Sequence, residues 1–330
     1  MIVNLNQMPF KMNKRYSKNS PLVQLTGKIL LLIVLCFCFP TLVNGQRNIT
    51  SIVQTVDVIT GQLDTVLRVT KHLEAPNWHP DNYLILNSGG KIYKLDLSLK
   101  QMAVIPTAFA DECNNDHGIS PDGKWLAISH NDTKHPSTKS YKSAIYRVPI
   151  GGGEPIAITT EVPSYWHGWN PDGQHVVYCA ERNGNFDIYS ISINSGAEKR
   201  LTTDPGLDDG PEYSPDGKYI YFNSYRSGQM QIWRMLAIGE TPEQLTFDKY
   251  SNWFPHLSSD HKSLIYIAYV ADQKDQHPFG QDVKLRLLDL KTKVIKDITP
   301  VFFGGQGTIN VPSWSPDNRK VAFISYEVKP

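Results

Sequence analysis

The stretch Gly210-Pro-Glu-Tyr-Ser-Pro-Asp-Gly-Lys-Tyr-Ile-Tyr-Phe-Asn-Ser224 has the pattern of a strand, a tight turn and a second strand. Ser-Pro-Asp-Gly suits the turn because proline presets φ, aspartate hydrogen-bonds the local backbone, and glycine adopts the left-handed conformation that closes it. The flanking residues are mostly aromatic or β-branched, which is typical of half-buried strands. The stretch therefore predicts a β-hairpin.

Variants of this hairpin recur along the chain, each with an aspartate in its turn. The six turn aspartates are Asp81, Asp122, Asp172, Asp216, Asp260 and Asp317. A second strand pair follows the hairpin, most clearly at residues 186–193 and 198–202. Self-similarity at a period of about 47 residues is typical of a repeat architecture. Four short antiparallel strands repeated six times predict an all-β fold, a six-bladed β-propeller of four-stranded blades.

The sixth repeat is divided between the two ends of the chain. After Asp317 the chain has room only for the second strand of a blade, at residues 321–325. Residues 51–59 and 64–70, which precede the first turn, match the third and fourth strands. We therefore expect N- and C-terminal strands to form the sixth blade together, which closes the ring and hides its sheet edges. One propeller domain is predicted for residues 46–330.

Residues 1–45 are predicted to be a secretory signal peptide. Basic residues precede the apolar run Ile29–Phe39, and the segment ends on Gly45. This apolar run is shorter than the ~20 residues of a spanning helix, so no membrane anchor is expected after cleavage. The remaining chain carries no basic stripe, which argues against nucleic-acid binding. We expect a periplasmic or secreted monomer in which Cys113 and Cys179 are separate thiols.

Several repeat signatures resemble the TolB-like β-propeller repeat. They are the turns Ser120-Pro-Asp-Gly123 and Asn170-Pro-Asp-Gly173, strands with Ile-Tyr such as Ile188-Tyr189, and ends with Leu-Thr such as Leu201-Thr202. The resemblance covers residues 49–328. It implies the six-bladed fold and a binding or scaffolding role like that of the TolB component of an envelope transport system. Related propellers with other roles include oligogalacturonate lyases, which hold a divalent metal with histidines and a glutamine.

One rim of the propeller is expected to carry the function. The strand order places every long loop on one rim and leaves only tight turns on the other, and long loops on a rigid scaffold commonly bind ligands. The first strand of each blade lines the central channel and begins at the loop-bearing rim. His117, His167, Glu212 and His256 stand at comparable positions in these strands. We therefore expect them around the channel mouth.

Two functions remain open at this mouth. In the first, the propeller binds an oligosaccharide or an envelope protein. The candidate ligand-binding side chains are those of Trp166, Arg182, Asp209, Arg226, Trp253 and Gln306. Aromatic faces next to guanidinium groups suit sugars, acidic ones in particular, and also suit a protein partner.

The second function is that of a metal-dependent lyase or hydrolase acting on acidic oligosaccharides. The resemblance to the oligogalacturonate lyases implies that His117, His167 and His256 hold one divalent ion, a role that suits imidazole. Glu212 or His277 would move the proton. Arg182 or Arg226 would neutralise a uronate. The sequence favours binding narrowly over catalysis.

Overall fold

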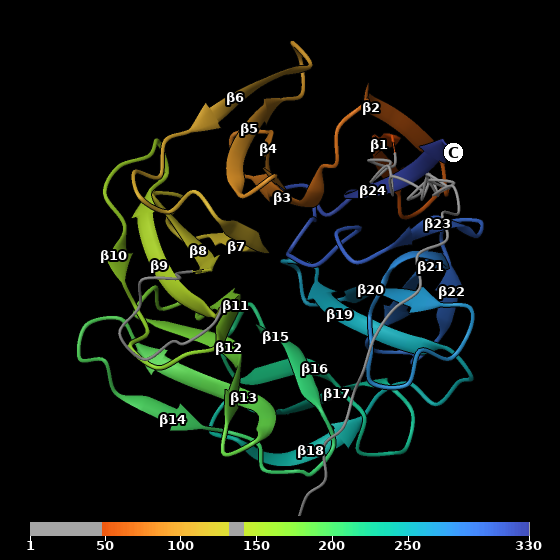
Figure 1. Ribbon diagram of the computed structural model, residues 1–330. Helices are drawn as coiled ribbons and strands as arrows, with labels where there is room; N and C mark the ends of the chain where they lie inside the picture. The colour runs from red at the N-terminus through yellow and green to blue at the C-terminus, as the bar shows by residue number, and fades with distance from the viewer. Residues whose placement is uncertain (1–47, 132–141, 330) are drawn as a thin grey trace, which may run out of the picture. The chain divides into compact units, whose positions relative to one another are not determined.

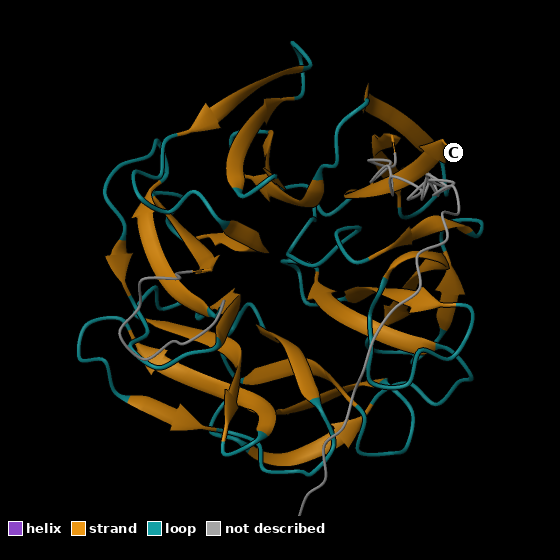
Figure 2. Ribbon diagram, in the orientation of Figure 1, coloured by secondary structure: helices purple, strands orange, loops and turns teal. Residues whose placement is uncertain are grey.

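The computed structural model describes residues 48–131 and 142–329. They lie within one compact unit, residues 46–330, and their regular structure is entirely β-strand (Figure 2). No helix long and apolar enough to cross a bilayer occurs among them. The predicted signal peptide and the middle of the loop at residues 130–142 lie outside the described residues.

Six antiparallel sheets surround a central axis (Figure 1), which confirms the predicted six-bladed propeller. In the first five blades the strands follow one another outward in chain order. Blade 1 contains β3 (Glu74–His79), β4 (Tyr83–Ser88), β5 (Lys91–Asp96) and β6 (Gln101–Ile105). Blade 2 contains β7 (Cys113–Ile119), β8 (Trp125–Asn131), β9 (Ser143–Pro149) and β10 (Ile156–Ala157). Blade 3 contains β11 (Ser164–Trp169), β12 (His175–Arg182), β13 (Asn185–Ser192) and β14 (Glu198–Arg200).

The fourth and fifth blades follow the same order. Blade 4 contains β15 (Asp208–Tyr213), β16 (Tyr219–Ser224), β17 (Gln231–Leu236) and β18 (Glu240–Gln244). Blade 5 contains β19 (Ser251–Leu257), β20 (Ser263–Tyr269), β21 (Phe279–Asp289) and β22 (Ile295–Asp297). A short extra strand, β23 (Phe302–Gly305), pairs with the first part of β21. This addition comes from the long segment that leads into the last blade.

The sixth blade joins the two ends of the described chain, as the sequence predicted. Its ordered strands are β24 (Lys320–Lys329), β1 (Asn48–Asp57) and β2 (Leu63–Val69). β1 and β24 pair along their whole length, from Asn48 opposite Lys329 to Asp57 opposite Lys320, so red-orange and blue ribbons share one sheet in Figure 1. The innermost position of this blade has no regular strand. A single β-bridge, between Trp314 and Val321, takes its place.

The repeated turns are closed as their sequence predicted. In blade 4, Ser214 Oγ donates to Asp216, and Gly217 N–H donates to the Ser214 carbonyl at 2.8 Å. Gly217 has φ of +72°. Where a repeat lacks glycine, another residue takes the left-handed conformation, as His261 and Asn318 do. The turn therefore also forms without glycine, but the residue that replaces it bears the strain of a left-handed backbone conformation.

The Leu-Thr and Ile-Thr ends of the repeats fix the end of the fourth strand to the third strand. The Oγ1 atoms of Thr202, Thr246 and Thr299 each accept a hydrogen bond of 2.9 Å from a backbone N–H of the third strand in their own blade. All three threonines are buried. A buried hydroxyl in this position satisfies an N–H where strand pairing stops, because unpaired buried donors are costly.

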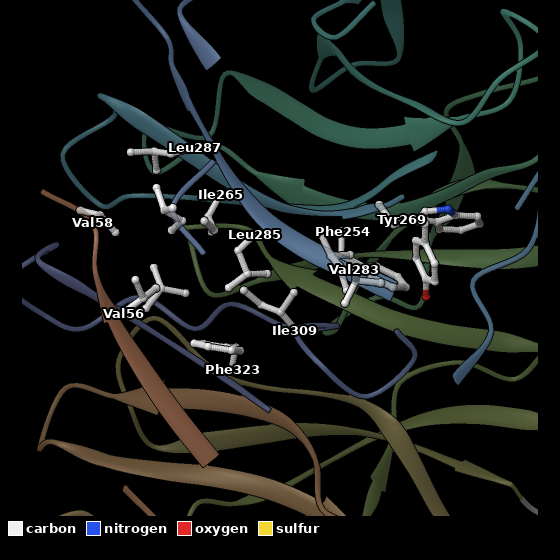
Figure 3. Close-up of a cluster of buried hydrophobic side chains, with 14 of the residues drawn as sticks. Val56, Val58, Phe254, Ile265, Tyr269, Val283, Leu285, Leu287, Ile309 and Phe323 are labelled. Carbon is white, nitrogen blue, oxygen red and sulfur yellow. The ribbon is translucent and has the colours of Figure 1, made fainter. Parts of the chain in front are cut away.

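The apolar core lies largely between neighbouring blades. Figure 3 shows one cluster, in which Val56 and Phe323 of the closing blade pack with Ile265, Val283 and Leu285 of blade 5. Tryptophans preceding the turns also join blades, since Trp169 Nε1 donates to the Gly118 carbonyl at 3.0 Å and Trp314 Nε1 to the His256 carbonyl at 3.0 Å. Cys113 and Cys179 are buried free thiols, as expected.

Candidate functional site

A β-bulge near the start of each innermost strand decides which side chains face the channel. In β7, Cys113 pairs with His130 and His117 with Ile128, so residues 114–116 stand opposite Ser129 alone. In β11, Trp166 pairs with Tyr178 and Gly168 with Val177, so only His167 is left out of the ladder. Bulges re-aim side chains next to binding sites. β3, β15 and β19 also contain a β-bulge in their pairing with the next strand.

The bulges open into a pocket of about 640 Å³. Its walls come from the beginnings of β7, β11, β15 and β19 and from segments around residues 207, 275–277 and 306. The lining residues are Asn114, Asn115, Asp116, Asn131, Tyr165, His167, Cys179, Phe186, Leu207, Asp209, Phe254, Asp275, Gln276, His277 and Gln306. The pocket therefore combines carboxyl and amide groups with aromatic rings, and no described lysine or arginine lines it.

Asp209 is the centre of a hydrogen-bonded network on one wall. Its Oδ1 lies 3.1 Å from Nε2 of His167, and it also accepts the Gly210 N–H at 2.7 Å. Burial favours the neutral acid, but His167, His277 and that N–H stabilise the carboxylate and lower the pKa of Asp209 to about 2. Burial opposes charge on His167 too, yet Asp209 raises its pKa above the ordinary value. Each side chain therefore favours the charged form of the other.

His277 connects this pair to the opposite wall. Its Nδ1 donates to Oε1 of Gln306, and Gln306 Nε2 donates to Asn115 at 3.2 Å. Burial lowers the pKa of His277 and favours its neutral ring, which the charge of Asp209 opposes. In the neutral ring Nε2 carries a lone pair, 3.8 Å from Asp209 Oδ2. In that state two hydrogen-bond acceptors face each other.

The carboxyl group of Asp116 faces the pocket without a hydrogen-bond donor among the described residues. The residue is 7% exposed. Burial raises its pKa to about 7; the charge of His167 opposes this and that of Asp209 adds to it. The pKa of the neighbouring Glu74 is raised in the same way. Burial and the charge of Asp116 raise it to about 7, although the hydrogen bond from Asn115 acts in the opposite direction.

Aromatic rings form the remaining walls. Tyr165 and Phe186 lie with their ring centroids 6.3 Å apart. Phe254 stacks on His167 at 6.1 Å and takes φ of +53° within the bulge of β19. Burial, with a smaller effect from Asp116, raises the pKa of Tyr165 to about 12, so its hydroxyl stays protonated and can donate. These rings offer flat apolar faces beside polar groups.

Four residues predicted from the sequence meet in this pocket: His167, Asp209, His277 and Gln306. Glu212 and His256 pair with each other instead. Oε2 of Glu212 lies 2.6 Å from His256 Nδ1, its Oε1 accepts the Leu257 N–H at 3.0 Å, and His256 Nε2 bonds the Ile309 carbonyl at 2.8 Å. Both partners are therefore occupied in joining blades 4, 5 and 6.

The other four predicted ligand-binding residues are buried in the core or held by ion pairs and hydrogen bonds. Trp166 and Trp253 are buried in the core, 1% and 0% exposed. Arg226 binds both oxygens of the buried Asp208 at 2.9 and 2.8 Å. Arg182 bonds the Pro163 carbonyl at 2.8 Å and Glu198 at 3.1 Å. None of these four side chains lines the pocket.

The three predicted metal-binding histidines occupy different surroundings. His117 is fully buried away from the pocket, where burial lowers its pKa to about 4, while His167 lines the pocket and His256 is held by Glu212. Within residues 48–131 and 142–329, no three His, Cys, Asp or Glu side chains are grouped so that they could hold a metal ion. These residues supply no set of ligands for the predicted divalent ion, which stays a prediction.

Asp116 and Asn115 are pocket residues that were not predicted from the sequence. Asp116 directly precedes His117, so it adjoined a residue already under consideration. The signal that would have found them is the bulge, which has no fixed sequence motif.

Comparison with known proteins places the chain in a family. Residues 164–304 match the model of the TolB beta propeller domain. An uncharacterized protein of Agrobacterium fabrum is 45% identical over 84% of this chain and 92% of its own length. The solved structure of a putative TolB from Agrobacterium tumefaciens is 44% identical, covers 84% of this chain and 99% of its own, and superposes with a TM-score of 0.79. This chain belongs to the TolB-like β-propeller family.

The likeness extends to a more distant TolB. The crystal structure of TolB from Acinetobacter baumannii is 22% identical, with a TM-score of 0.51 over 85% of this chain and 65% of that one. At this identity the comparison shows a shared fold. The pocket of this TolB-like propeller is therefore argued from its own residues.

A pH dependence of stability follows from the two protonated carboxyls. Asp116 and Glu74 have higher pKa values in the folded protein than in the unfolded chain, so folding takes up protons between about pH 4 and 7 and stability falls as the pH rises through that range. We expect the D116N variant to gain about 1–3 kcal/mol of unfolding free energy at pH 8 and clearly less at pH 4, where the carboxyl is mostly protonated in both states. Urea unfolding at both pH values measures this.

Other groups near Asp116 titrate and need a control. His167, Asp209, Glu74, Tyr165 and Cys179 all interact with it electrostatically. The D81N variant, which changes a carboxyl that is 82% exposed, should keep the parent's pH profile. A loss of stability in D116N at pH 8 would contradict the assignment.

Proposed function

We propose that this TolB-like propeller is a periplasmic or secreted binding protein that holds the end of an oligosaccharide in the pocket at the channel mouth. The observation that carries the proposal is the composition of this pocket. Amide and carboxyl groups alternate with Tyr165, Phe186 and Phe254 around a volume of about 640 Å³. Concave sites with aromatic walls and a few placed polar groups commonly bind small ligands.

The pocket fits a sugar bearing hydroxyl groups better than a uronate. The arginines expected to neutralise a uronate, Arg182 and Arg226, are held by Glu198 and by Asp208. Acidic side chains dominate the charged groups of the pocket, with Asp116, Asp209 and Asp275 against the histidines. A ligand carboxylate would be repelled there, whereas hydroxyl groups can donate to carboxyl and amide oxygens.

Binding to a panel of oligosaccharides tests this function. Isothermal titration of the purified protein with neutral, amino and uronate-containing oligosaccharides should detect a binder among the first two classes. The F186A variant, which removes one wall, should bind it about tenfold more weakly, a loss of about 1.4 kcal/mol. F247A is the matched control, because Phe247 is 77% exposed and lies outside the pocket.

Two outcomes would contradict the proposal. One is the absence of any saccharide binder with a correctly folded protein. The other is a binder whose affinity is unchanged in F186A, since that ligand would sit elsewhere. An envelope protein captured through the same pocket, with no saccharide affinity, would assign the site to a protein partner.

A further inference from the structure

The carboxyl group of Asp116 receives no hydrogen bond from the described residues, so the pocket lacks a donor for it. The residue is buried, with 7% exposed, and it lines the pocket without a donor among the described residues. Buried carboxyl groups are usually hydrogen-bonded or paired, and leaving one alone is costly. The site therefore retains an acceptor for which the described chain supplies no donor.

A second acceptor pair points the same way. His277 donates from Nδ1 to Gln306, so its neutral ring presents a lone pair at Nε2. That nitrogen stands 3.8 Å from Asp209 Oδ2, which is also an acceptor. A donor placed between them would satisfy both. This contact is made by residues other than Asp116.

Acidic side chains outnumber basic ones in and beside the pocket. Asp116, Asp209 and Asp275 line it, and Glu74 adjoins it through Asn115, whose Nδ2 lies 3.4 Å from Glu74 Oε1. No lysine or arginine of the described chain lines the pocket, so His167 and His277 are the described lining residues that can carry positive charge. A ligand that brings positive charge and several N–H donors complements this arrangement.

We propose that the ligand carries a protonated primary amine, as an amino sugar does, and that Asp116 receives it. The ammonium group has three donors and one charge, which suit a buried carboxylate. The hydroxyl groups of the same sugar can donate between His277 and Asp209, and Tyr165 and Phe186 flank the ring. This inference rests on the proposed saccharide function and narrows its ligand class.

The decisive comparison uses two ligands that differ only at nitrogen. A glucosamine trisaccharide with free amines and its fully N-acetylated counterpart are titrated into the protein at pH 7, with a glucose trisaccharide as a neutral reference. The free amine should bind at least tenfold more tightly than the acetylated form. In the D116N variant this ratio should fall towards one.

Controls separate the charge of Asp116 from general effects. D81N changes an exposed carboxyl and should keep the parent's ratio. Removing an unpaired buried carboxylate is not expected to unfold the protein, and a thermal unfolding transition confirms folding of D116N. Equal binding of the amine and acetylated ligands, or a ratio that survives in D116N, overturns the amine inference and leaves the saccharide function standing. No binding of any of the three trisaccharides overturns both.

Discussion

Replacing Glu212 by alanine is expected to lower the free energy of unfolding by about 3–5 kcal/mol, the usual result of removing one partner of a buried, hydrogen-bonded polar pair. Glu212 holds His256 at 2.6 Å and caps the Leu257 N–H at 3.0 Å, and the side chains of the pair are 12% and 4% exposed. Without the carboxylate, the imidazole and this N–H lose their partner inside the core. Urea denaturation followed by tryptophan fluorescence measures the change.

The control for this prediction is another glutamate in an ion pair. Glu243 pairs with Arg234, but its side chain is 50% exposed, so E243A should cost less than about 1 kcal/mol. If E212A proved as mild as E243A while ligand binding was lost, Glu212 would have the functional role that its sequence position suggested. A strong loss of stability assigns it to the joints between blades 4, 5 and 6.

The second large effect is expected at the contact between Trp166 and Gly118. Trp166 is 1% exposed, and W166A should cost about 3–5 kcal/mol by leaving a cavity. A Cβ atom on Gly118 would lie 1.7 Å from the ring carbon Cη2 of Trp166. G118A should therefore destabilise the protein by about 1–3 kcal/mol through overpacking.

A double-mutant cycle isolates this contact. In the W166A background the ring is absent, so G118A should cost much less than in the parent, and the two changes should be clearly non-additive. Additive costs would show that the close approach is relieved by movement elsewhere. Trp166 was predicted to bind ligand, and unchanged ligand affinity in a folded W166F variant would agree with its place in the core.

The fold could be predicted because its determinants are local. Each Pro-Asp turn sets a hairpin by itself, and the interval between turns fixes the repeat. The closing blade followed from the strand patterns on either side of it, at residues 51–59 and 321–325. The structure confirms both, although a single bridge from Trp314 replaces the expected first strand of that blade.

The site could be predicted only in part, because it depends on bulges and on distant pairs. His117 and His167 stand at the same distance from their turns, but the bulge in β7 falls before His117, whereas that in β11 falls on His167 itself. One histidine is consequently in the core and the other in the pocket. Likewise, only the folded chain brings Arg226 onto Asp208. Sequence spacing carries neither piece of information.

The pairing of β1 with β24 has a consequence for how the protein folds. These two strands form ten residue pairs, although all the other described strands lie between them in the sequence. β1 therefore has no β24 to pair with until the rest of the propeller has been made, and long-range pairing of this kind is slow. Until the ring closes, β1 keeps one edge unmatched, and unpaired strand edges are prone to aggregation.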